Sequence, residues 1–414
     1  MTSSLRASIL DPGALRADFP ILAQRINGHP LAYLDSAAST QKPLAVLETM
    51  TVFYQSDYAN VHRGVHTLSE RATVAYEGAR ARVARFVGSD DPTEIVFTRG
   101  TTEAINLVAG SWGAANLGPG DAVLVTGLEH HANIVPWQLL SQRTGCRLLA
   151  CPVTDRGDVD LEAWNRLLTA EPVKLAAFLH TSNALGTVNP ALEMIAAARA
   201  AGARVLIDGA QAAPHRAIDV HALGCDFFCF SAHKVYGPTG IGALWARREL
   251  LDAMPPWQGG GDMIRTVAFE GTTFADPPHR FEAGTPAIAE AVGFAAALDY
   301  VDAAGLDAIA AHEHALVERI LERLAEFPEV RLVGEPEERA SVVSFYFGNV
   351  HPHDVGQVLD ESGVAVRVGH HCAMPVMQRF GVPATVRASV GLYSSADDVD
   401  ALARGLVRVR EVFG

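Results

Sequence analysis

Short apolar runs separated by longer amphipathic stretches are the feature that most constrains the fold of this 414-residue chain. The runs occupy residues 94–98, 122–126, 175–180, 204–208, 226–231 and 242–246. Runs this short and apolar are typical of strands buried on both faces, which occur in mainly parallel sheets. Intervening segments such as residues 191–201, which end at Gly202, indicate helices. The alternation predicts an α/β fold with helices on both faces of a sheet.

The sequence changes in character after about Glu290. A helical stretch covers residues 291–327 and is broken near Gly305, and strand patterns follow at residues 341–347 and 385–389. The chain ends in a predicted helix from about Ala396. This order predicts a second, smaller α+β domain.

Composition and charge exclude several classes of function. The formal charge of −14 argues against a nucleic-acid or anionic-membrane partner, because both would repel an acidic surface. The N-terminus has no apolar segment typical of a secretory signal, and no apolar run approaches the roughly 20 residues of a membrane helix. Five cysteines in so long a chain are not a disulfide framework. We expect a cytoplasmic protein.

Polar residues follow three of the predicted strands, where ligands bind in open parallel sheets. Thr101 and Thr102 begin a helix, which suits either an anion such as phosphate or ordinary capping. Asp208 ends an apolar strand and could pair with a pyridinium nitrogen or cap a turn. Lys234 could form a Schiff base or reach solvent from the strand end. Together they are the parts of a pyridoxal-phosphate site.

Two further segments carry reactive side chains. His130 follows the second strand and could stack on an aromatic cofactor, whereas a metal site at His130 and His131 is disfavoured because neighbouring side chains diverge. Cys372 lies in a loop with Arg367 and two histidines, and nearby cations favour the nucleophilic thiolate. No CxxC accompanies it, so no metal site is predicted. The other cysteines are assigned to the core, with Cys225 and Cys229 placed on one face of a strand.

Ten short motifs are spread along the chain after about residue 15, namely LDSAA (34–38), NVHRGVH (60–66), RGTTE (99–103), EHHAN (129–133), SNALGT (182–187), DGAQ (208–211), SAHK (231–234), FEAGTP (281–286), RVGHHC (367–372) and RAS (387–389). In these motifs the chain resembles the class V aminotransferase-like enzymes, specifically the second group of cysteine desulfurases, the SufS and selenocysteine-lyase type. The cysteine motif is the most specific, because its short loop distinguishes this group from the first.

The resemblance implies residue roles. Lys234 would bind pyridoxal 5'-phosphate and move the α-proton, His130 would stack on the ring, and Cys372 would accept sulfur. The other implied cofactor-binding residues are Thr102, Asp208, Gln211, Ser231, His233 and, from a second subunit, Thr285. The implied substrate-binding residues are Asn183, Arg387, Arg367 and Arg63.

The resemblance also implies an architecture and an activity. The expected fold is fold type I of the pyridoxal-phosphate enzymes, with a mainly parallel seven-stranded sheet in a large domain at 30–290. A small domain at 291–414 would carry the cysteine loop and pack with an N-terminal segment at 1–29. The expected enzyme is a homodimer that converts L-cysteine to L-alanine. It would pass a persulfide from Cys372 to a SufE-like or SufU-like acceptor for iron–sulfur cluster assembly.

Alternatives stay open within and beyond this fold, because fold does not fix reaction. A selenocysteine lyase would share every motif and would act on L-selenocysteine. Cys372 in its short loop argues against an aminotransferase or a kynureninase-like lyase. The joint presence of Lys234, Asp208 and Cys372 argues against a non-catalytic sulfur-carrier scaffold.

Overall fold

A seven-stranded sheet forms the centre of the computed structural model, which describes residues 10–414. Its order is β4-β10-β9-β8-β7-β5-β6. The strands are β4 (Ile95–Thr98), β5 (Ala122–Thr126), β6 (Arg147–Cys151), β7 (Val173–Leu179), β8 (Arg204–Asp208), β9 (Phe227–Ser231) and β10 (Gly242–Ala246). Only β10 runs antiparallel to its neighbours β4 and β9 within this sheet. The mainly parallel sheet predicted from the apolar runs is confirmed.

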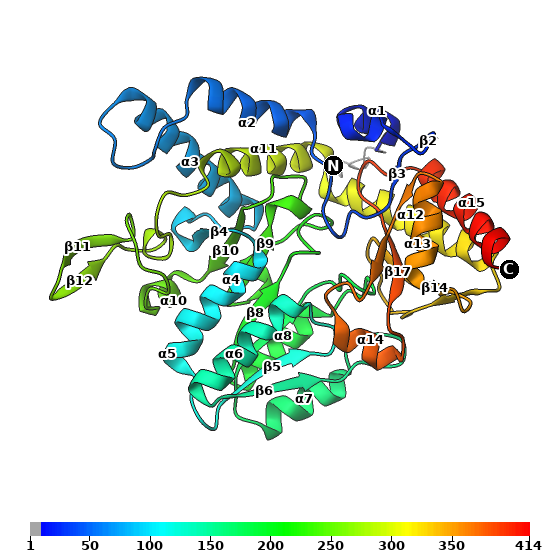
Figure 1. The fold of residues 1–414 in the computed structure, drawn as a ribbon. Coiled ribbons are helices and arrows are strands. Elements are labelled where there is room, and N and C mark those ends of the chain that lie inside the picture. Colours follow the sequence, from blue (N-terminus) through cyan, green and yellow to red (C-terminus); the bar gives the residue numbers. More distant parts are fainter. Residues whose placement is uncertain (1–9) are drawn as a thin grey trace, which may run out of the picture.

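Helices cover both faces of this sheet, as Figure 1 shows. One face packs against α4 (Thr101–Val108), α6 (Val135–Thr144) and α10 (Arg248–Ala253). The other packs against α3 (Thr67–Phe86), α7 (Leu161–Ala170), α8 (Ala191–Ala200) and α11 (Ile288–Ala304), with α2 (Leu44–Ser56) lying along α11. The short helices α5 (Ala114–Asn116) and α9 (Val220–Leu223) complete this part.

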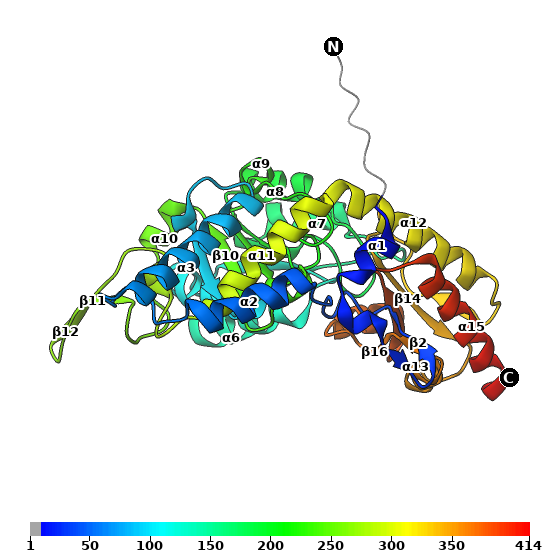
Figure 2. The same ribbon diagram turned by 90° about the horizontal axis from the view of Figure 1, so that it is seen from above.

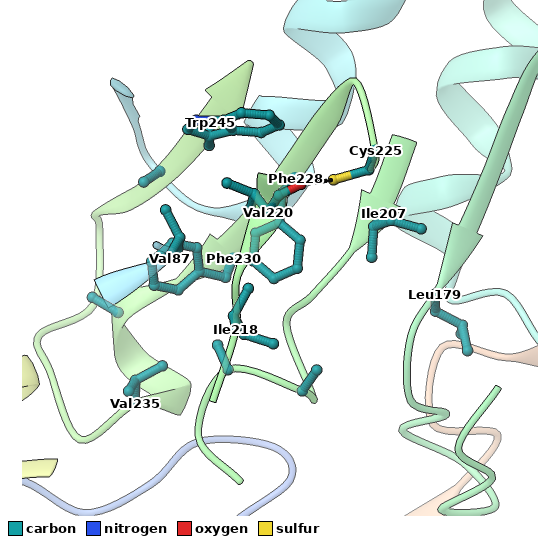
Figure 3. Close-up of a cluster of buried hydrophobic side chains, with 14 of the residues drawn as sticks. Val87, Leu179, Ile207, Ile218, Val220, Cys225, Phe228, Phe230, Val235 and Trp245 are labelled. Atoms are coloured by element: carbon teal, nitrogen blue, oxygen red, sulfur yellow. Dashed lines mark hydrogen bonds between the residues drawn. The ribbon is translucent and has the colours of Figure 1, made fainter. Parts of the chain in front are cut away.

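Alternating side chains of β9 explain why the strand is apolar throughout. Phe227 and Cys229 point into the cluster beneath α4 and α6, whereas Phe228 and Phe230 point into the opposite cluster. Figure 3 shows the second cluster, where Cys225 also lies, its thiol directed at the Val220 carbonyl oxygen. All four cysteines assigned to the core are buried. The placement of Cys225 and Cys229 on one face was wrong, because Cys225 precedes the strand and packs on the opposite side.

The smaller α+β unit follows α11, and its sheet has the order β13-β14-β17-β16. The strands are β13 (Val330–Leu332), β14 (Val342–Phe347), β16 (Arg367–Gly369) and β17 (Thr385–Ser389). The helices are α12 (Leu306–Ala325), α13 (Pro352–Glu361), α14 (Met374–Phe380) and α15 (Ala396–Phe413). Apolar side chains of the strands and of α12, α13 and α15 form a core separate from those of the large sheet, whereas Val376 and Met377 of α14 pack into a core of the large sheet.

The N-terminal part lies beside the small domain in Figures 1 and 2. Its elements are α1 (Pro12–Ala17), β1 (Arg25–Ile26), β2 (His29–Pro30) and β3 (Ala32–Tyr33), and β3 pairs with β15 (Val364–Ala365). Arg16 Nη1 lies 3.0 Å from Asp398 Oδ2 at the start of α15. The Arg16 contact supports the proposed packing of the segment at 1–29, of which residues 1–9 lie outside the described residues, whereas β3 lies beyond that segment. The division at 290/291 stays a proposal, since α11 spans it and packs against α2 and α3.

A hairpin that was not predicted projects from the large domain, at the end far from the C-terminus (Figure 2). It consists of β11 (Ile264–Ala268) and β12 (Gly271–Phe274), and Phe269 at its turn is fully exposed. The loop at residues 255–261 precedes it.

Candidate active site

A cavity of about 180 Å³ lies beyond the carboxyl ends of β8 and β9, where the cysteine loop of the small domain faces the large sheet. The predicted site residues that line it are Thr102, His130, Asn183, Asp208, Gln211, Ser231, His233, Lys234, Arg367, Cys372 and Arg387. Thr285 and Arg63 lie elsewhere. One chain therefore brings together the predicted ring-binding, phosphate-binding and sulfur-accepting residues.

The start of α4 offers backbone donors to an anion. Its N-cap is Gly100, which provides no side-chain cap, so neither threonine performs the ordinary capping considered above. The Thr101 N–H donates to Ser231 Oγ at 2.8 Å, and the two hydroxyls lie 2.8 Å apart. Among the described residues, the N–H groups of Thr102 and Glu103 have no such partner. Free N–H groups at a helix start attract a phosphate.

Lys234 and Asp208 form the electrostatic centre of the cavity. Burial lowers the pKa of Lys234 to about 8, and Asp208 opposes this shift by stabilising the ammonium. Asp208 is itself 5% exposed, and burial raises its pKa while Lys234 and the Ala210 N–H lower it. The Ala210 N–H donates to Asp208 Oδ1 at 2.9 Å, which fixes the carboxylate in the turn after β8. A buried carboxylate with a cation nearby is suited to pairing with a protonated ring nitrogen.

His130 is neutral and its tautomer follows from its hydrogen bond. Burial, together with Lys234, lowers its pKa to about 3. Its Nδ1 accepts from the Ala132 N–H at 3.0 Å, so the proton lies on Nε2. The neutral His130 imidazole lines the cavity, so it can stack on an aromatic ring and donate one hydrogen bond.

His233 is held through its carbonyl oxygen, which accepts from the Thr40 N–H at 3.0 Å.

A buried guanidinium closes another side of the cavity. Arg387 Nη1 donates to the Asn183 carbonyl oxygen at 2.8 Å, and Nη2 donates to Asp35 Oδ1 at 3.0 Å. Arg387 Nε and Asn183 Oδ1 are buried and have no partner among the described residues. Arg367 lies at the same carboxylate, with Nη1 3.6 Å from Asp35 Oδ2. This arrangement can bind the carboxylate of an amino acid.

The cysteine loop enters the cavity from the small domain. Cys372 is partly exposed, and its N–H donates to His370 Nδ1 at 3.1 Å. His371 Nε2 lies 2.8 Å from Thr385 Oγ1, and Asn183 Nδ2 donates to the His371 carbonyl oxygen at 2.6 Å. Asn183 therefore links the loop to the arginine that it also contacts.

Several residues of the site were not assigned a role from the sequence. The Asp35 carboxylate forms ion pairs with Arg367 and Arg387. The Thr101 N–H donates a hydrogen bond to Ser231 Oγ. Glu129 is fully buried, and burial raises its pKa to about 8 although Asn133 Nδ2 and the Leu179 N–H donate to it. Asp35 directly follows an apolar run, which was the same strand-end pattern that identified Asp208.

Thr285 and Arg63 lie outside the main cavity. Thr285 lines a second cavity of about 390 Å³ with Trp257 and Glu282. Arg63 Nε lies 3.1 Å from Asp262 Oδ1, and its side chain is 61% exposed. Neither could contact a ligand in the main cavity of the same chain without moving.

One cluster among residues 10–414 could offer metal ligands, although no metal site was predicted. His62, Glu77 and His279 place their ligand atoms within 4.8 Å of one another. His62 Nε2 already lies 2.8 Å from Glu77 Oε1, and Arg80 Nε donates to Glu77 Oε2 at 2.8 Å. A hydrogen-bonded network therefore accounts for the cluster.

None of the helices at residues 10–414 has both the length and the apolar character of a membrane span.

Comparison with known proteins agrees with this geometry. The family model for aminotransferase class-V matches residues 32–402. A cysteine desulfurase of Dickeya dadantii is 56% identical over 401 residues, which is 97% of each chain. A probable cysteine desulfurase of Streptomyces coelicolor is 51% identical over 413 residues, covering 98% of this chain and 99% of its own.

Solved structures give the same result. The apo cysteine desulfurase of Thermococcus onnurineus superposes with a TM-score of 0.92 at 40% identity, covering 97% of this chain and 98% of its own. The Escherichia coli cysteine desulfurase CsdA, as its S-sulfonic acid, gives 0.90 at 39% identity, covering 98% of this chain and 100% of that chain. The family resemblance predicted from the motifs is confirmed. The chain belongs to the aminotransferase class-V family.

Proposed function

We propose that this chain is a pyridoxal-phosphate-dependent cysteine desulfurase. It converts L-cysteine to L-alanine and receives the sulfur as a persulfide on Cys372. The observation that carries the proposal is that Lys234, Asp208, Arg387 and Cys372 line one cavity. The same space is thus faced by an amine that can bind the cofactor, a carboxylate that can pair with its ring nitrogen, a guanidinium that can bind a carboxylate, and a thiol from the small domain.

Pyridoxal phosphate fits the residues of this cavity. The α4 start has free N–H groups for the phosphate, Asp208 suits the ring nitrogen, and the neutral ring of His130 can stack. Gln211 lies beside them, with its Nε2 donating to the Ala37 carbonyl oxygen at 2.7 Å and its oxygen left for the ligand. When bound, the protonated pyridine ring withdraws electrons from the substrate Cα and makes its proton removable.

The chain's own residues would supply positioning, proton transfer and the sulfur acceptor. Arg387 binds the substrate carboxylate through its unpartnered buried Nε, and Asn183 can contribute only through Nδ2, the donor of its side-chain amide. Lys234 takes the proton from Cα and returns it, which its lowered pKa favours near neutral pH. The Cys372 thiolate then attacks the substrate sulfur. The S–S bond forms as the Cβ–S bond breaks, its electron pair stays on Cβ, and a proton completes the methyl group of alanine.

The nearest alternative is a selenocysteine lyase, which would use the same residues. An aminotransferase or kynureninase-like lyase would not need Cys372 at the cavity, and its place there disfavours both. A scaffold without catalysis would not need the unpartnered buried atoms of Arg387 and Asn183.

We further propose a homodimer in which Thr285 and Arg63 reach the partner's cavity. Both lie outside the cavity of their own chain. Exposed apolar side chains occur on α2, on the segment that leads into α3, on α3 and on the hairpin, namely Leu47, Val52, Tyr54, Tyr58, Val65, Val74, Val267 and Phe269. A surface this apolar favours contact with another protein. A fully active monomer in light scattering at working concentration would contradict the dimer.

The sulfur leaves Cys372 for an acceptor protein of the SufE-like or SufU-like type, which would serve iron–sulfur cluster assembly in the cytoplasm. Only four residues separate Arg367–Gly369 from the start of α14, so the loop is too short to carry Cys372 far. Met374 beside it is 57% exposed and offers an apolar contact to a docking protein. The five free cysteines are consistent with a reducing compartment.

Alanine and sulfide production from L-cysteine, with and without each acceptor type, tests this function. We expect alanine to form and turnover to rise with one acceptor. Lys234→Ala should abolish turnover, and its normal turnover would exclude the proposed site. L-Selenocysteine in the same assay measures the alternative, which a strong preference for selenium would favour.

A further inference from the structure

The cysteine loop is tied to the large domain at two points by one residue that the mechanism above does not use. The His131 N–H donates to the Cys372 carbonyl oxygen at 2.7 Å. The Met374 N–H donates to His131 Nε2 at 3.1 Å. The rings of His131 and His370 lie 5.5 Å apart between centroids. His131 therefore contacts the main chain at the sulfur acceptor itself and at the residue that begins α14.

The loop needs such support because its backbone is unfavourable. His371 and Cys372 have φ of 51° and 54°, in the left-handed region that costs residues with a side chain. Helix α14 begins at Met374 after Ala373, which provides no side-chain cap. The Met374 N–H is thus one of the donors that a helix start leaves unpaired, and the His131 ring satisfies it from the other domain.

The turn that carries His131 is firmly held. Glu129 at its start is fully buried and accepts from Asn133 Nδ2 at 2.7 Å and from the Leu179 N–H at 3.0 Å. His130, which lines the cavity, belongs to the same turn. Because His130 and His131 share this turn, the turn that holds the loop also holds the residue that is expected to stack on the cofactor ring.

We propose that His131 is a positioning residue for sulfur transfer, which holds the Cys372 loop over the cavity through its main chain and its neutral ring. This inference rests on the proposed desulfurase function and adds a residue to it. Because Nε2 accepts a hydrogen bond, the ring carries its proton on Nδ1.

The ring can hold the loop only while it is neutral, so the anchor depends on pH. The titratable groups that face it are His130 on its own turn and His370 and Cys372 on the loop. Burial and the neighbouring His370 lower the pKa of His131. The hydrogen bond from the Met374 N–H to the ring is therefore intact at neutral pH and is lost as the pH falls through that lowered pKa, whereas the main-chain bond to Cys372 does not titrate.

Residue-resolved amide hydrogen exchange of the holoenzyme tests the contact without turnover. His131→Leu removes the acceptor but keeps the main-chain bond, and we expect protection of the Met374 amide to fall about three- to tenfold, as for one lost hydrogen bond. His131→Gln places an amide oxygen near the Nε2 position and should restore it. Wild-type protection should also fall on acidification, whereas that of His131→Gln should not. His314→Leu, at an exposed position of α12, is the matched control.

The rate of sulfur addition to Cys372 measures the consequence. We expect His131→Leu to slow it about three- to tenfold while L-alanine binding is unchanged, with His131→Gln near wild type. Wild-type protection and rate in His131→Leu would overturn the proposal. A wild-type enzyme that adds no sulfur to Cys372 would instead contradict the desulfurase function. In that case the exchange measurement still decides whether His131 holds the loop.

Discussion

Replacing Arg387 by alanine should selectively weaken the binding of ligands that carry a carboxylate. Nη1 and Nη2 each donate one hydrogen bond, to Asn183 and Asp35, so the buried Nε–H and the second N–H of each Nη are left for a ligand. A hydrogen bond to a charged group contributes about 1.5–3 kcal/mol. At about 1.4 kcal/mol per factor of ten, we expect affinity to fall about 10- to 150-fold. Without Arg387, the negative Asp35 carboxylate would repel the ligand's carboxylate, so we expect the loss of affinity to lie toward the upper end of this range.

L-Alanine and ethylamine differ by the carboxylate alone, which makes them a matched pair of ligands. Binding of each to the holoenzyme can be followed by visible absorbance in wild type and in Arg387→Ala. A general distortion of the site would weaken both ligands equally, whereas loss of the carboxylate contact weakens only alanine. Adding Asp35→Asn should relieve part of the loss. An alanine-to-ethylamine affinity ratio that stays within about threefold of wild type would refute the assignment.

The remaining predictions concern titration and stability. Uptake of pyridoxal phosphate by the apoprotein should rise from pH 7 to 9 with a midpoint near 8, because the neutral Lys234 amine is the reactive form and burial lowers its pKa to about 8. Asp208→Asn removes the anion that raises the pKa of Lys234, so it should move the midpoint to lower pH. Stopped-flow absorbance measures the uptake, and a midpoint at the pKa of an ordinary lysine would contradict the predictions for the wild type and for the variant. Glu313→Ala should lower the free energy of unfolding by about 1–3 kcal/mol, because it removes the buried hydrogen bond between Glu313 Oε2 and His215 Nδ1, which lie 2.6 Å apart between the domains. Exposed Glu318→Ala should cost less than about 1 kcal/mol in the same denaturant titration.

The large sheet was predictable because strands buried on both faces need apolar residues throughout. β6 did not stand out, since it is an edge strand with exposed residues such as Arg147. The antiparallel direction of β10 was not predictable, because a local apolar run carries no information about its neighbour's direction. Every residue of β12 is exposed, so the hairpin had no apolar pattern to detect.

The candidate site divides in a similar way. Asp208 is the last residue of an apolar strand and Lys234 comes soon after another, so their place at the sheet edge could be inferred from the chain alone. The contact of Asp35 with Arg387 joins residues 352 positions apart and depends on how the two domains pack. The same is true of His131 and Met374, 243 positions apart. The sequence was enough to identify the reactive groups, whereas the residues that position them could be identified only from the structure.

Mass spectrometry of the holoenzyme after a short pulse of L-cysteine tests the central claim most directly. We expect one added sulfur on Cys372, which lines the cavity, because the other four cysteines are buried in the core. Cys372→Ala should bind pyridoxal phosphate normally, acquire no added sulfur and form no alanine. Added sulfur on Cys146, Cys151, Cys225 or Cys229, or wild-type alanine production by Cys372→Ala, would contradict the account.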